Sequence, residues 1–404
     1  MAIKFRRKRF FWVRLTAFLL IVAACGVGFV WNGVIEDFTN RQIFGNEQPP
    51  TTLSGNGMYV HFIDVGQGDA AVITFPCDSV IIVDAGGTSN ASRQAFSDYL
   101  RTHIFPNTTN ASQRVVTYFI ATHSHADHIG AGVYLFQNYT VQNVVRPKSF
   151  TQAEINNNFH NSYIHPSTGN PISNAMVHDT LTFRNFINAM NESVNNNITN
   201  SVTIPYRGKE IGASIIGAEI QFLSPYGYNF NAGLNRLSTI FTITFQNRTI
   251  MFTGDSYVAC ENDMLDSLPF GVTLSVDILD VSHHGSTTST SQRFIDHIQP
   301  TYAIIQVGSN NFGHPHNSII RRLENANATI FTTRQVGDIV VRVDALTGQI
   351  EINGAISPGE WFSYWMIVIM VVTISFGALL AMDFFTKGNR QNNTRKTKTK
   401  RARR

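Results

Sequence analysis

Two long uncharged stretches lie near the ends of the chain, on either side of a middle in which apolar and polar positions alternate. Residues 15–35 and residues 361–382 contain no Asp, Glu, Lys or Arg. Each stretch is long enough to cross, as a helix, a hydrocarbon layer about 30 Å thick. The pattern predicts two single transmembrane helices, which makes the lipid bilayer the first expected partner.

The charges beside these stretches predict the topology. Residues 1–14 and residues 383–404 are basic, and Lys and Arg are retained on the cytoplasmic side of a membrane. Both termini are therefore expected to be cytoplasmic and the middle extracytoplasmic, raised on a polar stalk at residues 36–56. A cleaved signal peptide is the alternative for the first stretch. An uncleaved anchor is preferred, because the apolar run exceeds a usual signal core and Trp31 suits a membrane interface.

Residues 57–353 carry short apolar runs that suit a folded α/β domain. The runs are rich in β-branched residues and end at turns, as strands do, and helical periodicity lies between some of them, at residues 89–103 and 130–138. Residues 150–200 are rich in Asn and predict loops or an insertion of loop and helix. The expected strands are residues 59–63, 70–75, 80–83, 115–121, 141–145, 219–223, 239–245, 249–252, 276–281, 302–307, 329–332 and 339–343. Strands in both halves predict two sheets with helices outside, and Asn247-Arg248 predicts the turn of one hairpin.

The formal charge of the whole chain, +4, says little about the middle. The two basic flanks hold 15 of the 31 Lys and Arg residues, which leaves 16 to face nearly all of the 27 acidic residues. A negatively charged domain disfavours a long groove for duplex nucleic acid, which needs many basic contacts. The basic tail is expected to lie on anionic lipid, with nucleic-acid binding as the alternative. Four basic residues could still line a short cleft, although surface ion pairs are their commoner role: Arg146, Lys148, Arg207 and Lys209.

The cysteines leave one question open. Cys25 lies in the first predicted span, so only Cys77 and Cys260 belong to the middle. A disulfide between these two is permitted on the extracytoplasmic side. Two small buried apolar side chains are the alternative.

The densest group of candidate ligands follows the strand expected at residues 115–121. It consists of His123, His125, Asp127 and His128. Imidazole and carboxylate are ligands that suit zinc, manganese or iron. Alternate residues of an extended segment point the same way, so His123 and His125 can bind one ion, and the turn that follows directs Asp127 and His128 toward a second. Polar capping of a helix is the competing interpretation, but four such groups so close together favour metal ligands.

Other candidates follow other expected strands. Asp255 is the natural carboxylate to bridge two ions, and Gly254 before it permits a close backbone approach. Either His283 or His284 should complete the second ion site, while the other hydrogen-bonds locally or contacts substrate; the spacing favours His283. His314 stands on a loop stiffened by proline, where an ordinary loop histidine is as good an interpretation as a functional one.

These segments resemble the metallo-β-lactamase superfamily and, within it, the extracytoplasmic hydrolase domain of the ComEC family of bacterial DNA-uptake channels. The likeness rests on the H-x-H-x-D-H element with Asp84 before it and Asp255 after it. It also rests on four segments that lie in the family's order between about residues 59 and 345: Phe62–Ala70, Thr253–Asp255, His283–Ser286 and Gly313–Pro315. With only two expected spans, the chain cannot be the channel itself.

The resemblance implies a four-layer αββα sandwich with two divalent ions between the sheet edges. Zinc is the first expectation for these ions, and manganese is the alternative. His123 and His125 would bind one ion, Asp127 and His128 the other, and Asp255 both, with His283 finishing the site. Asp84 would hold a ligand imidazole from behind. The superfamily usually supplies one more histidine, for which the chain offers three candidates in a poorly patterned region, and it can lack that ligand altogether. The candidates are His160, His165 and His178, the last at a plausible separation.

Two ions of this kind activate a water for attack on a phosphorus or carbonyl centre. The prediction is a membrane-anchored phosphodiesterase or nuclease, in which Asp127 accepts or relays the proton and the substrate is a nucleic-acid fragment or a cell-envelope phosphodiester. Hydrolysis of a lactone, thioester or β-lactam on the same fold is one alternative. A surface binding domain without catalysis is another.

Overall fold

The computed structural model describes residues 56–159, 176–212, 217–224, 233–269 and 272–353. The chain divides into two units, residues 1–355 and residues 356–404, and every described residue belongs to the first. Both expected transmembrane helices, nearly all of the expected stalk and the basic tail lie outside the described residues. Within the described part, no helix is long and apolar enough to cross a membrane.

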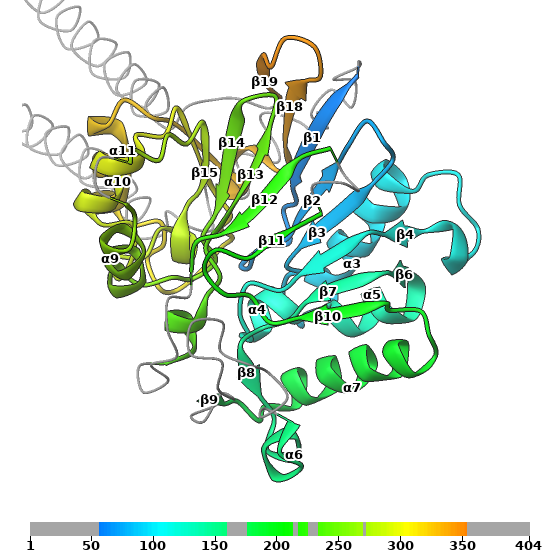
Figure 1. Cartoon of the computed structure of the whole chain (residues 1–404). Helices are drawn as coiled ribbons and strands as arrows, with labels where there is room; N and C mark the ends of the chain where they lie inside the picture. The colour runs from blue at the N-terminus through cyan, green and yellow to red at the C-terminus, as the bar shows by residue number, and fades with distance from the viewer. Residues whose placement is uncertain (1–55, 160–175, 213–216, 225–232, 270–271, 354–404) are drawn as a thin grey trace, which may run out of the picture. The chain divides into compact units, whose positions relative to one another are not determined.

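An eight-stranded sheet forms one half of the frame, in the order β10-β7-β5-β3-β2-β1-β18-β19 (Figure 1). Strands β3, β5, β7 and β10 run parallel to one another, whereas β3, β2, β1, β18 and β19 pair antiparallel in that order. The strands are β1 (Gly57–Phe62), β2 (Ala71–Thr74), β3 (Val80–Val83), β5 (Tyr118–Ile120), β7 (Asn143–Val145), β10 (Ser201–Thr203), β18 (Ile339–Asp344) and β19 (Ile350–Asn353).

A seven-stranded sheet forms the other half, in the order β11-β12-β13-β14-β15-β16-β17. It repeats the same plan, because β11 to β14 pair antiparallel and β14 to β17 pair parallel. The strands are β11 (Glu210–Ile211), β12 (Glu219–Phe222), β13 (Phe241–Phe245), β14 (Arg248–Phe252), β15 (Ile278–Asp280), β16 (Tyr302–Ile305) and β17 (Thr329–Thr332). Two short parallel pairs stand apart: β4 (Val115–Val116) with β6 (Thr140–Val141), and β8 (Ser149–Phe150) with β9 (Met176–Val177).

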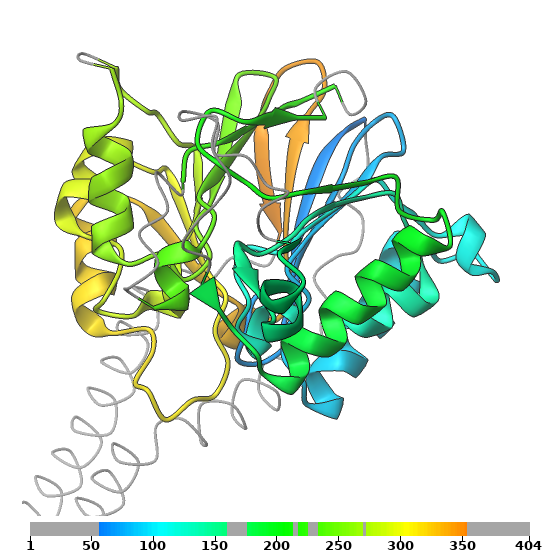
Figure 2. The same ribbon diagram turned by 60° about the horizontal axis from the view of Figure 1, so that its bottom comes forward.

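Helices cover the outer face of each sheet (Figures 1 and 2). The first sheet is covered by α3 (Asn90–Tyr99), α5 (Gly132–Asn138) and α7 (Leu181–Asn195). The second is covered by α9 (Val258–Asp266), α10 (Gln292–Ile298) and α11 (Asn317–Asn325). The short elements are η1 (Leu100–Ile104), η2 (Ala111–Gln113), α4 (Ala126–Ile129), α6 (Gln152–Asn156), η5 (Leu234–Leu237), η6 (Ser282–Gly285) and α12 (Thr333–Val336).

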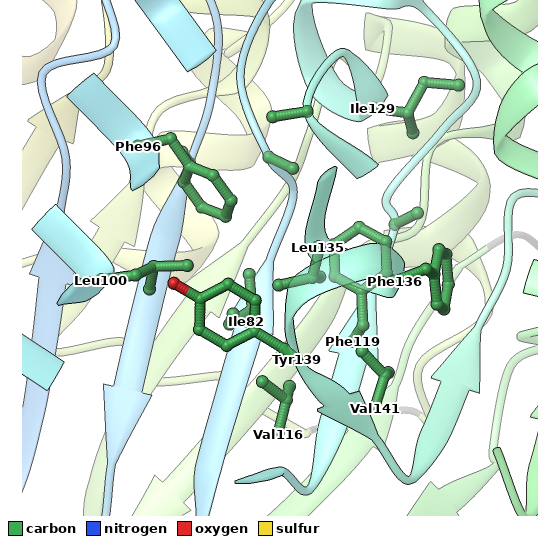
Figure 3. Close-up of a cluster of buried hydrophobic side chains, with 14 of the residues drawn as sticks. Ile82, Phe96, Leu100, Val116, Phe119, Ile129, Leu135, Phe136, Tyr139 and Val141 are labelled. Carbon is green, nitrogen blue, oxygen red and sulfur yellow. The ribbon is translucent and has the colours of Figure 1, made fainter. Parts of the chain in front are cut away.

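Three apolar cores hold these four layers together. Between the sheets, Phe252 of β14 stacks on Phe241 of β13 and on Phe62 of β1, with ring centroids 5.1 and 5.9 Å apart. Figure 3 shows the core under the first helical layer, where Phe96 and Leu135 pack with the sheet. A third core lies under α9, α10 and α11. Strands buried on both faces carry continuous apolar runs, and the layering is the αββα arrangement that the resemblance implies.

Several elements differ from their expected bounds. The strand expected at residues 115–121 breaks at Thr117 into β4 and β5. In the Asn-rich region, α7 is a full helix, capped by Thr180, whose side chain accepts from the backbone N–H of Phe183. The hairpin turn is Gln246-Asn247 rather than Asn247-Arg248, because the positive φ angles, 50° and 58°, fall on the first pair and suit a type I′ turn.

The two cysteines of the domain form no disulfide. The Cys77 thiol donates to Ser79 Oγ at 3.3 Å, and the buried Cys260 thiol donates to the Arg236 carbonyl at 3.4 Å. The structure therefore bears out the expectation of two separate thiols. Only Cys260 is buried, however, and Cys77 is exposed.

Candidate two-metal site

The candidate ligands follow the carboxyl ends of parallel strands from both sheets. His123 and its neighbours follow β5, Asp255 follows β14, and His284 follows β15. Loops at the carboxyl ends of strands are the usual place for ligand sites in α/β sheets. The close approach of the two sheets here depends on Gly254, whose φ is +49° and at which a Cβ would stand 2.7 Å from Thr122 Oγ1.

The first group of ligand atoms comes from His123, His125 and Asp255, all within 4.8 Å of one another. His123 Nε2 lies 3.1 Å from His125 Nδ1 and 3.6 Å from Asp255 Oδ2. Two imidazole nitrogens bound to one tetrahedral zinc would be about 3.4 Å apart, since each Zn–N distance is about 2.0–2.1 Å. The spacing therefore suits one ion between these three side chains.

The second group comes from Asp127, His128 and His284, whose ligand atoms also lie within 4.8 Å of one another. His284 Nε2 is 3.4 Å from Asp127 Oδ2. Asp255 Oδ1 lies 3.2 Å from His128 Nε2 and 3.8 Å from His284 Nε2, while its other oxygen faces the first group. One carboxylate thus reaches both groups, which is the geometry of a bridging ligand.

His284 takes the place in this cluster that the spacing assigned to His283. His284 is buried, whereas His283 is in none of the described ligand groups and binds Thr288 Oγ1 through Nδ1 at 2.9 Å. His283 Nε2 still lies 3.5 Å from Asp255 Oδ2, at the edge of the site. Both residues have a φ of +54°, a sharp turn after β15 that carries the second histidine inward. Sequence spacing does not reveal such a turn, so the geometry favours His284 as the ligand.

Asp84 stands behind His128, as the resemblance implies. Its Oδ2 accepts from His128 Nδ1 at 2.7 Å and from Thr122 Oγ1 at 2.6 Å, and its Oδ1 accepts from the Thr122 backbone N–H at 2.7 Å. With Nδ1 fixed as a donor, Nε2 of His128 is the nitrogen that faces the ion site. This geometry suits Asp84 as the residue that would orient His128 from behind.

Asp69 and Gln306 support His284 in a similar way and were not identified from the sequence. His284 Nδ1 donates to the Gln306 backbone carbonyl at 2.9 Å and lies 3.1 Å from Asp69 Oδ1. Asp69 belongs to the turn Gly66–Asp69 within the resembling segment Phe62–Ala70. That position was the available signal, but an Asp in a glycine-rich turn reads first as a turn residue.

Buried polar atoms test whether a cation fits here. His128 Nε2 and Asp255 Oδ1 are both buried and lie 3.2 Å apart, but neither atom makes a hydrogen bond of good geometry with any described residue. Leaving buried polar atoms unpaired is costly. A divalent ion that accepts imidazole and carboxylate ligands, such as zinc or manganese, would satisfy both atoms. The donor set therefore fits two divalent ions.

The protonation of the histidines leads to the same conclusion. Burial opposes a charge on His128 and His284, but nearby carboxylates, first Asp255 and Asp84 for His128 and first Asp69 and Asp255 for His284, raise the pKa of both imidazoles well above the ordinary value. Burial also opposes ionisation of Asp255, yet the same histidines hold its pKa well below the usual range. Without metal, protons on these imidazoles balance the buried carboxylates, and a bound cation would replace them.

The remaining candidate histidines lie at or beyond the edge of the cluster. His178 Nδ1 bonds to Ser124 Oγ at 2.8 Å, and its ring centroid is 6.1 Å from that of His125. It belongs to none of the described ligand groups, so its role as an extra ligand stays a prediction. His160 and His165 lie outside the described residues. The ring of His314 lies 5.6 Å from that of His283.

Two of the four basic residues that could line a short cleft, Arg146 and Lys148, are buried instead. Arg146 is fully buried and bonds to Glu154 Oε1 at 2.5 Å and to the Ser149 carbonyl at 2.6 Å. Lys148 is also buried, at 1% exposure. Both side chains are therefore shielded from solvent rather than exposed on the wall of a cleft.

Replacing each of the adjacent histidines separately distinguishes their roles. We expect His284→Ala to weaken binding of the second ion by at least ~100-fold, since a direct ligand should matter more than its supporting residues. His283→Ala should retain two ions per chain. Metal content and affinity of the purified full-length variants provide the measurement, and the reverse pattern would show that the spacing was the better guide.

Asp84→Asn should weaken metal binding by about 10- to 100-fold. With the amide oxygen accepting from Thr122 N–H, the NH₂ group faces His128 Nδ1 and forces the proton onto Nε2, the nitrogen that faces the ion. Asp98→Asn, on the exposed face of α3, is the matched control. Equal metal affinities in the two variants would contradict the orienting role of Asp84.

Comparison with known proteins agrees with this geometry. The model of the metallo-β-lactamase superfamily matches residues 63–154. ComE operon protein 3 of Bacillus subtilis is 27% identical over 300 residues, which cover 72% of this chain and 33% of that protein. Recombination protein 2 of Haemophilus influenzae is 31% identical over 140 residues, 34% of this chain and 17% of that protein. The chain thus spans about a third or less of the length of these relatives.

Two solved structures show distant likeness. The diiron β-hydroxylase CmlA of Streptomyces venezuelae is 15% identical with a TM-score of 0.42, covering 72% of this chain and 55% of that one. The metallo-β-lactamase SMB-1 is 15% identical with a TM-score of 0.33, covering 69% and 96%. The family match and the competence-protein relatives lead to one conclusion: the chain is ComEC-like, and its residues 63–154 match the metallo-β-lactamase superfamily.

Proposed function

We propose that the chain is a membrane-anchored two-metal phosphodiesterase with its catalytic domain outside the cytoplasm. Members of the metallo-β-lactamase superfamily are metal-dependent hydrolases. The observation that carries the proposal is the position of Asp255, whose two oxygens face two adjoining groups of ligand atoms. A bridging carboxylate suits two ions held side by side, the arrangement used for in-line displacement at phosphorus.

The residues of the cluster have separate tasks in this reaction. Two divalent ions held by these residues would supply Lewis-acid stabilisation of negative charge and a nucleophilic water at neutral pH. Asp127 is the most exposed carboxylate of the cluster, with a side chain 38% exposed, and we assign to it the proton that the attacking water loses. Burial favours the neutral acid, but the hydrogen bond from His284 and the charge of His128 lower the pKa of Asp127, so it is ionised beforehand.

His283 is placed to contact the substrate, and the buried Asn235 lies beside it. His283 Nε2 and Asn235 Nδ2 lie 3.4 Å apart, and each lies within 3.5 Å of Asp255 Oδ2. His283 is partly exposed, at 19%, whereas the ligand histidines His123 and His128 are buried. A donor at the edge of the ion site could bind a phosphoryl oxygen, which gives His283 the role of a substrate contact.

The substrate class follows from the relatives and from the charge. Two relatives are a competence protein and a recombination protein by name, which favours nucleic acid. The excess of acidic residues between the two basic flanks disfavours a long duplex and favours single strands, ends or short fragments. A cell-envelope phosphodiester shares the same reactive group. Membrane anchoring rests on the two uncharged stretches and their basic flanks.

Hydrolysis by the full-length chain tests this proposal. The chain loaded with zinc or manganese should cleave an aryl phosphodiester and end-labelled single-stranded DNA. Asp255→Asn should lower the rate by at least ~100-fold, because it removes the bridging charge. Asp266→Asn, an exposed Asp on α9, should leave the rate unchanged.

Three results would overturn the proposal. Cleavage of a lactone, a thioester or a β-lactam, with no action on phosphodiesters, would establish a different hydrolase. Two bound ions with no hydrolysis of any of these substrates would point to a binding domain. Phosphodiester cleavage that persists in Asp255→Asn would place the active site elsewhere.

A further inference from the structure

The loop between β16 and α11 carries aromatic rings that the metal site does not use. Phe312, His314 and His316 follow one another at alternate positions, and Phe312 is 69% exposed. A single exposed apolar side chain is ordinary on a protein surface. The significance of Phe312 depends on the conformation of the loop that carries it and on the position of that loop.

One side chain fixes the conformation of this loop. The Asn310 amide donates to the carbonyls of Gly308 and His314, each at 2.9 Å. Its Oδ1 accepts from the backbone N–H groups of Phe312 at 3.0 Å and His314 at 3.1 Å. Four hydrogen bonds from one residue make the segment from Gly308 to His314 a preformed turn, so an aromatic ring on it is presented at little entropic cost.

The loop is also docked against the metal site. The His316 backbone N–H donates to the carbonyl of Gly285 at 3.0 Å, and Gly285 directly follows His284. A Cβ at Gly285 would stand 2.6 Å from Pro315 Cβ, so the contact requires glycine there. On the other side, the Gly308 N–H donates to Gln67 Oε1 at 3.3 Å. The position of Phe312 is therefore tied to the position of His284.

The rings form a row that leads from solvent to the cluster. The centroid of Phe312 lies 5.7 Å from that of His314, with the planes inclined by 31°. The His314 centroid lies 5.6 Å from that of His283 and 6.4 Å from that of His284. A planar group that lies on the exposed Phe312 ring would thus be next to the place where the reaction is proposed to occur.

We infer that Phe312, supported by His314, is a stacking platform for a nucleobase beside the phosphodiester that is cleaved. The inference rests on the proposed function for its substrate class. Bases stack on aromatic side chains without dependence on sequence or charge. A domain with excess acidic residues has few cationic contacts to offer a polyanion, so stacking is the kind of contact that can hold a single strand in register with the ions.

Binding of two single strands that differ only in their bases tests the platform. One is an ordinary deoxyoligonucleotide and the other is an abasic strand with the same number of phosphates. Fluorescence anisotropy with the full-length chain in chelator gives affinities without cleavage. We expect Phe312→Ala to weaken binding of the ordinary strand by about fivefold or more, the usual effect of losing one base stack, and to leave abasic binding unchanged.

Two further variants show whether the effect belongs to the ring. Phe312→Trp should keep the affinity for the ordinary strand, because it keeps an aromatic face. Leu346→Ala, which removes a side chain 88% exposed on the turn between β18 and β19, should change neither affinity. The platform is ruled out if Phe312→Ala weakens both strands equally or neither, if Phe312→Trp behaves like Phe312→Ala, or if the unaltered chain binds the two strands alike.

The binding test can contradict the stacking platform without contradicting the proposed function, and the reverse is also true. Base-dependent binding without phosphodiester cleavage would remove the proposed reaction and keep the platform. Phosphodiester cleavage with base-independent binding would remove the platform alone.

Discussion

The carboxylate of Asp255 is the group on which the rest of the site depends. It is buried between His123 on one side and His128 and His284 on the other. A buried carboxylate is stable only when positive charge lies beside it. In the metal-free protein the raised pKa values of His128 and His284 supply that charge as protons, and two divalent ions would supply it in the active form.

The fold brings residues from both sheets to this cluster. Each sheet is antiparallel at one side and parallel at the other, and the parallel strands β3, β5, β14 and β15 end at the cluster. The backbone takes a positive φ at Asp84, His283 and His284, a conformation that costs energy in residues other than glycine and that clusters at functional sites. The hydrogen bonds of Asp84 and the packing of the three apolar cores stabilise this backbone conformation.

Much of this arrangement was predictable from local pattern, and the rest was not. Strand-end positions pointed to His123 and Asp255, because ligands follow the ends of apolar strands, whereas Asp84 came from the resemblance. The choice between His283 and His284 was out of reach, since it depends on a turn with two positive φ angles. Helix α7 was hidden by Asn-rich composition, although its apolar face is regular, and the role of Asp69 depends on Gln306 and His284, which are distant in sequence.

The central claim is that two cations and the protons on the histidines compete for the same buried carboxylates. Calorimetric titration of the metal-free full-length chain with zinc, in two buffers of different ionisation enthalpy, measures both sides of that competition. The account predicts two ions per chain, net proton release at pH 7, and an affinity that rises with pH, because the raised pKa values leave His128 and His284 protonated beforehand. Fewer than two ions, or two ions bound without proton release, would contradict it.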